Sequence, residues 1–138
     1  MPNSHGSVNG IVTIGTNSSN GMILTVADKD ANTYLLGNDA ASTHIDTGAG
    51  AVADGVSKWN ISAVSASTTV TDEGSEYTPL ASVTNAAMVA STDSPITIYT
   101  GTKAEEADVT MSYNFGTAAN QPAGVYTDTI TYSVSIND

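Results

Sequence analysis

The sequence predicts an all-β fold, an antiparallel β-sandwich of about seven to nine short strands. Three observations lead to this prediction. Apolar and polar residues alternate in several segments, clusters of Gly, Asn, Ser and Pro separate those segments, and no stretch shows the 3.6-residue period of a helix. The 138 residues suit a single domain with a core of its own.

The strongest strand prediction covers residues 124–136, within the stretch AGVYTDTITYSVSI. Side chains of a strand point alternately to opposite faces, so alternate residues share one face. One face would carry Tyr126, Asp128, Ile130, Tyr132, Val134 and Ile136. The other face carries only Thr and Ser after Val125. This pattern indicates a long strand with one apolar and one hydroxylated face, as in antiparallel sheets.

Other segments repeat the pattern from the N-terminus onward. The stronger strand predictions cover residues 7–15, 21–27, 57–64, 94–101 and 108–116. Weaker ones cover residues 33–36, 43–46, 76–80 and 86–90. The segment 108–116 and the C-terminal strand are expected to pair as a hairpin across the loop TAANQPAG. Trp59 lies on an apolar face, which favours a place in the core.

The number and spacing of these strands favour an immunoglobulin-like topology, with a barrel as the alternative. We expect residues 1–6 to form a flexible N-terminal segment and residues 7–138 to form one immunoglobulin-like domain.

Charge and composition exclude several classes of function. The chain has 14 acidic and 3 basic residues, a net charge of −11, which disfavours nucleic acid and anionic membranes as partners. It has no cysteine, so it forms no disulfide or thiolate metal site. No apolar run is long enough for membrane insertion. The start MPNSHGSVNG carries no signal peptide, so an exported protein would need a leader and an anchor outside these residues.

Several motifs resemble one group of proteins. The stretch QPAGVYTDTITYSVS is similar to the closing strand of immunoglobulin-like domains in bacterial surface proteins, and VTIGTNSSNGMILTVADKDANTYLL resembles the front half of such domains. GVSKWNIS and DSPITIYTG stand where those domains carry middle strands. The chain also resembles WxL-type surface domains, but WNI and YSV stand here where those domains carry Trp-x-Leu. The resemblance implies a secreted, cell-surface location, with neighbouring surface-protein domains or glycans as partners.

One polar cluster, DKDANTYLLGND, suggests a metal site. Asp28, Asp30, Asn32 and Asp39 stand at positions one, three, five and twelve of a calcium loop. Thr33 occupies the sixth position, which glycine usually fills. The alternative is a hairpin turn in which the Asp and Asn side chains bind their own backbone. Calcium is the one cofactor that the sequence suggests.

No combination of residues points to catalysis, since His5 and His44 are far apart and form no metal-binding spacing. The sequence therefore favours a non-enzymatic structural or adhesive domain of a larger bacterial surface protein. One alternative is a self-assembling pilus or surface-layer subunit that pairs through residues 7–15 or 124–136. The other is a calcium-dependent binding module.

Overall fold

The computed structural model describes residues 3–38, 43–70, 74–76 and 83–137, and they contain strands and no helix. The ten strands are β1 (Ser4–Thr16), β2 (Met22–Asp28), β3 (Leu35–Gly37), β4 (His44–Ile45), β5 (Lys58–Val70), β6 (Gly74–Glu76), β7 (Ile96–Thr100), β8 (Glu105–Thr117), β9 (Tyr126–Thr127) and β10 (Ile130–Ile136). All pairs between these strands are antiparallel. The all-β prediction is therefore confirmed.

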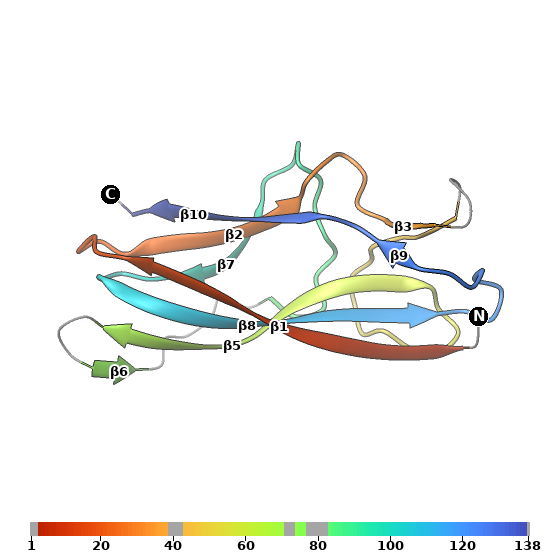
Figure 1. The fold of residues 1–138 in the computed structure, drawn as a ribbon, viewed down its shortest axis with the longest axis horizontal. Coiled ribbons are helices and arrows are strands. Elements are labelled where there is room, and N and C mark those ends of the chain that lie inside the picture. Colours follow the sequence, from red (N-terminus) through yellow and green to blue (C-terminus); the bar gives the residue numbers. More distant parts are fainter. Residues whose placement is uncertain (1–2, 39–42, 71–73, 77–82, 138) are drawn as a thin grey trace.

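The strands form three sheets, which Figure 1 shows along the length of the molecule. Sheet A has the order β1-β8-β5-β6, sheet B the order β10-β2-β7, and sheet C the order β4-β3-β9. Sheets B and C lie end to end along the long axis, and together they face sheet A (Figure 1). The chain passes from sheet C to sheet B between β9 and β10.

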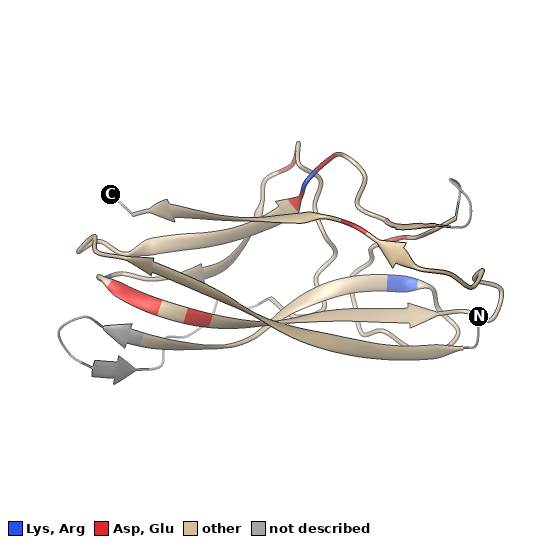
Figure 2. Cartoon of the chain, viewed as in Figure 1, with Lys and Arg blue, Asp and Glu red and all other residues tan. Residues whose placement is uncertain are grey.

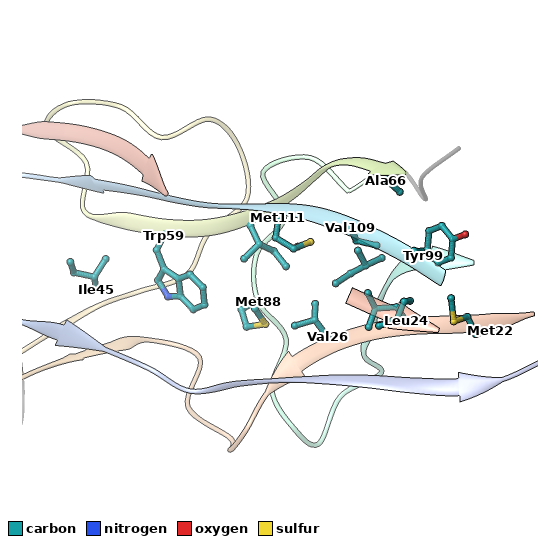
Figure 3. Packing of buried hydrophobic residues seen from close by; sticks show 14 residues of the cluster. Met22, Leu24, Val26, Ile45, Trp59, Ala66, Met88, Tyr99, Val109 and Met111 are labelled. Atoms are coloured by element: carbon teal, nitrogen blue, oxygen red, sulfur yellow. The ribbon is translucent and has the colours of Figure 1, made fainter. Parts of the chain in front are cut away.

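The core lies between sheets A and B. Met22, Leu24 and Val26 of β2 are fully buried, as are Val109 and Met111 of β8. Figure 3 shows these side chains converging from the two sheets, with Trp59 and Met88 farther along the same layer. The strict alternation of β2, in which every second residue is buried, follows from having one face toward this core.

Two β-bulges change which residues face the core. In β7 the register shifts opposite Leu24 and Thr25, and both Ile98 and Tyr99 are fully buried. In β5 it shifts between Ala63 and Ser65, so that the inward residues are Ile61 and Ala63 before the shift and Ala66 and Thr68 after it. An extra residue in one strand of an antiparallel pair has this effect. The sequence prediction kept a single parity through residues 94–101 and ended the other segment at residue 64, so it included neither bulge.

The predicted hairpin between residues 108–116 and the C-terminal strand is wrong. β8 pairs with β1 and β5, whereas β10 pairs with β2. The predicted C-terminal strand is also divided into β9 and β10, which belong to different sheets. Strands with matching patterns can pair side by side or face each other across a core, and alternation alone does not distinguish these arrangements.

The weaker strand predictions have mixed outcomes. The segments 33–36 and 43–46 overlap β3 and β4. Within 86–90 the structure places one isolated bridge, between Ile61 and Ala86. Of the segment 76–80, residues 77–80 lie outside the described residues. At the N-terminus, β1 begins at Ser4, so Ser4, His5 and Gly6 of the expected flexible segment pair with β8.

The polar face of sheet A is partly buried, although the sequence pattern predicted that it faces solvent. Asn60 is 0% exposed and Asn114 is 8% exposed. Asn114 Nδ2 donates to Asn60 Oδ1 at 3.0 Å, and Asn60 Nδ2 donates to the carbonyl oxygens of Gly48 at 2.9 Å and Gly50 at 2.7 Å. Buried amides need such partners, so this network holds the segment after β4 against β5.

Candidate functional site

The residues of the predicted calcium loop are divided by the fold. Asp28 is the last residue of β2 and is buried, while Asp30 and Asn32 lie exposed in the following segment. Asp39 lies outside the described residues. The N–H of Asp30 donates to Asp28 Oδ1 at 3.1 Å, and the N–H of Asn32 donates to Asp30 Oδ1 at 2.8 Å. These bonds are the side-chain-to-backbone turns that the sequence left as an alternative.

The described residues contain no group of three or more His, Cys, Asp or Glu side chains placed to hold a metal. They do contain a carboxylate pair that the sequence prediction did not include, formed by Asp28 and Asp128. Asp28 pairs with Ile130 across the β2–β10 ladder, and the Lys29 N–H donates to the Thr129 carbonyl at 3.0 Å. Asp128 therefore follows the ladder onto the same inward face, two residues before Ile130.

Each carboxylate of the pair has one bonded and one unbonded oxygen. Asp28 Oδ1 accepts the Asp30 N–H, and Asp128 Oδ1 accepts the Thr129 N–H at 2.8 Å. The Oδ2 atoms of both residues are buried and have no hydrogen-bond donor. The two carboxyl groups lie within hydrogen-bonding reach of each other. A bond between them needs a proton on one of the two groups, because an ionised carboxylate only accepts.

The environment favours such a proton on Asp128. Burial, reinforced by the neighbouring Asp28 carboxyl, raises the pKa of Asp128 from 3.8 to about 7. The N–H of Thr129 opposes this rise, and the charge of Asp30 adds to it. Near neutral pH, with its pKa at about 7, the Asp128 carboxyl is therefore present in both its protonated and its ionised form.

We predict that the Asp128 carboxyl makes the protein less stable as the pH rises. The unfolded chain loses this proton near pH 3.8 and the folded chain near pH 7. Between these values the folded state binds more protons, so the free energy of unfolding falls with rising pH and levels off above about pH 7. Thermal melts from pH 5 to pH 8 with a chelator present test this.

The variant Asp128→Asn is the control, because its amide does not titrate and can donate to Asp28 Oδ2. The melting temperature of the wild type should fall relative to that of the variant between pH 5 and pH 8. A constant difference between the two proteins across this range would contradict the prediction.

An apolar cleft of about 440 Å³ adjoins the carboxylate pair, and Asp128 contributes to its wall. Most of its lining side chains are aromatic or aliphatic: Leu35, Trp59, Tyr113, Phe115, Tyr126 and Tyr132. The hydroxyl oxygens of Tyr113 and Tyr132 lie 2.5 Å apart, and burial together with this contact raises the pKa of Tyr132 above its ordinary range. The cleft is therefore lined both by sheet A and by β3, β9 and β10, and the Tyr113–Tyr132 contact joins sheet A to β10.

The remaining candidate residues, Trp59 and the two histidines, make contacts with other residues of the protein. Trp59 is 5% exposed and its Nε1 donates to the Thr33 carbonyl at 2.9 Å, which confirms the predicted core position. His5 Nδ1 lies 2.6 Å from Asp54 Oδ1, and His44 Nε2 lies 3.4 Å from Asp46 Oδ1, both at the surface. These contacts involve a single carboxylate each.

Asp128 could have been found from the sequence. It is the one charged residue on the apolar face of the segment 126–136. A charge on a face that is otherwise buried needs a partner, which is a reason to search for one. The partner itself could not be identified from the sequence, because it depends on the pairing of β10 with β2.

Comparison with protein-family models, with characterised proteins and with solved structures finds no match to this chain. Among the residues that the structure describes, no helix is long and apolar enough to cross a membrane.

Proposed function

We propose that this chain is an immunoglobulin-like β-sandwich domain that serves as a non-enzymatic structural or adhesive module of a larger bacterial surface protein. Two features support the fold. The sequence motifs resemble such domains, and sheets A and B contribute side chains to one shared core. The same resemblance supports an extracellular or cell-surface location.

The observation that carries the structural role is the position of the two chain ends. β1 starts at one end of the long axis and β10 finishes at the opposite end (Figure 1). Domains whose N- and C-termini lie at opposite ends can be linked in tandem, so that each domain extends the protein by its own length. A spacer that carries a binding region away from a cell surface needs this geometry.

The direction of the terminal strands adds a mechanical argument. β1 and β10 run in the same direction along the long axis (Figure 1), and each is antiparallel to its partner. Force applied at the two ends would pull β1 along β8 and β10 along β2. The β1–β8 ladder runs without a register shift from Ser4↔Thr117 to Thr16↔Glu105. Its hydrogen bonds would therefore resist together and would not open one at a time.

Single-molecule pulling tests the structural role. Handles at the N- and C-termini should give a high unfolding force. The matched control attaches the handles by cysteines in place of Asn3 and Asn120, which lie near the same end of the β1–β8 ladder. The chain has no native cysteine, so attachment is specific.

This control geometry opens the ladder from one end and should require a clearly lower force. Equal forces in the two geometries would contradict a role in which the terminal strands resist tension.

Binding to glycan arrays or to other surface-protein domains distinguishes the adhesive role from the spacer role. If the protein binds none of these ligands, the adhesive role is ruled out and the spacer role remains.

A second candidate function, assembly through strand pairing, is favoured by a separate observation. β1 is an edge strand of sheet A and β10 is an edge strand of sheet B. Neither strand contains Asp, Glu, Lys, Arg or Pro, and both are tan throughout in Figure 2. Charged side chains and prolines are the usual protection of sheet edges against pairing. Ile11 is 69% exposed on β1, and Val134 is 48% exposed on β10.

Light scattering across a concentration series tests this candidate. If edges pair, the apparent mass of the wild type should rise with concentration. Ile11→Lys or Val134→Lys should restore the monomer, because a charge on an edge strand prevents pairing. The control is Val56→Lys, at a residue that is 50% exposed outside the strands and should leave assembly unchanged. A wild type that remains monomeric at high concentration rules out strand-paired assembly.

A further inference from the structure

The Asp28–Asp128 pair combines burial, negative charge and unsatisfied oxygens. Asp28 is 2% exposed, and its Oδ2 atom has no hydrogen-bond donor. Asp128 Oδ2 is likewise buried without a donor. Buried ionised oxygens are costly unless a counter-charge satisfies them. Either a proton or a cation is therefore needed between these two groups.

The surroundings of the pair favour a cation. Asp30 adds a third negative charge close to Asp128. The neighbouring lysine, Lys29, is exposed. A surface hollow beside the pair, lined by Lys29, Asp30, Asn32 and Asp128 among others, gives a small ion access to Asp128 from solvent. The whole chain carries a net charge of −11, which raises the local concentration of cations.

We propose that Asp28 and Asp128 bind a calcium ion at the junction between sheets B and C. The ligands are hard carboxylate oxygens without a histidine or thiolate among them, which favours a hard cation such as calcium over zinc or copper. Calcium takes about six to eight oxygen ligands, so backbone carbonyls or water would have to fill the remaining positions. Asp30 contributes charge and orients Asp28 through its N–H bond to Asp28 Oδ1.

This site differs from the loop that the sequence suggested. Its two ligands lie a hundred residues apart, and the exposed Asn32 side chain has no part in it. Asp28 ends β2 in sheet B, and Asp128 lies where the chain passes from β9 in sheet C to β10 in sheet B. Bound calcium would tie these segments together. The inference goes beyond the proposed structural role and does not depend on it.

The test is calcium binding by the full chain, first treated with a chelator, at pH 7.5 and physiological ionic strength. Titration calorimetry with CaCl₂ should show saturable heat for the wild type. At a calcium concentration about a hundredfold above Kd, the melting temperature should rise by about 5–10 °C. Asp128→Asn should weaken binding at least about tenfold and lose the rise in melting temperature, while circular dichroism shows that it remains folded.

Glu106→Gln is the matched control, because it removes one exposed carboxylate from β8 in sheet A and should bind calcium like the wild type. Two results would overturn the proposal. One is the absence of both heat and a melting-temperature rise in the wild type, in which case the pair shares a proton. The other is an equal response in Asp128→Asn, which would indicate general charge screening. Asp28→Asn is a second variant, and it should also lose binding if it folds.

Discussion

Leu24→Ala is expected to lower the free energy of unfolding by about 3 kcal/mol, the usual cost of truncating a fully buried leucine. Leu24 is 0% exposed, and its side chain lies in the layer between sheets A and B (Figure 3). The truncation leaves a cavity that the surrounding strands cannot close, since interiors are tightly packed. Urea denaturation followed by tryptophan fluorescence measures the loss, and Trp59 is the only tryptophan.

Leu36→Ala provides the matched control for this prediction. Leu36 lies on β3 and is 42% exposed, so the same truncation should cost less than about 1 kcal/mol. A similar loss in both variants would mean that Leu24 is not part of a close-packed layer. That result would contradict the core described above.

Gly21→Ala is expected to cost about 3 kcal/mol as well, for a different reason. Gly21 precedes β2 with φ of +84°, a conformation that costs an L-residue about 1 kcal/mol or more. A Cβ at this position would also lie 2.2 Å from the Gly101 carbonyl oxygen, which belongs to the backbone and cannot rotate away. The Gly101 N–H donates to the Met22 carbonyl at 2.8 Å, so relief of the clash would break the contact between β2 and β7.

Gly55→Ala separates the two contributions. Gly55 has φ of +85°, nearly the same as Gly21, but no atom lies within 4 Å of its added Cβ. Its substitution should therefore cost about 1 kcal/mol, from backbone strain alone. Equal losses in the two variants, measured by the same denaturation experiment, would show that the close approach of Gly101 to Gly21 has no energetic effect.

The sequence predicted the location of most strands because alternation is a local property. In β2, Met22, Leu24 and Val26 are buried, as the pattern indicates. It did not predict the partners of β8 and β10, because pairing depends on residues far apart in the chain. The alternation of residue types also did not predict the bulge in β7, because the bulge depends on how β7 pairs with β2.

The candidate site divides in the same way. Asp28 was recognised as a candidate ligand from its neighbours in sequence, and its turn bond to Asp30 was anticipated as an alternative. Its partnership with Asp128 arises from the ladder between β2 and β10, which places the two carboxylates on one buried face. A local acidic motif therefore located half of the pair, and the tertiary structure supplied the other half.

The sequence by itself determined the all-β character of this protein, its acidity and the buried side of β2 and of much of β8. These properties follow from residue type and from a two-residue period, which operate over short distances. Only the tertiary structure decided which strands share a sheet, that Asn60 and Asn114 are buried on the polar side, and that Asp28 meets Asp128. Each of these depends on contacts between segments distant in sequence, where a shift of one residue would reverse the faces.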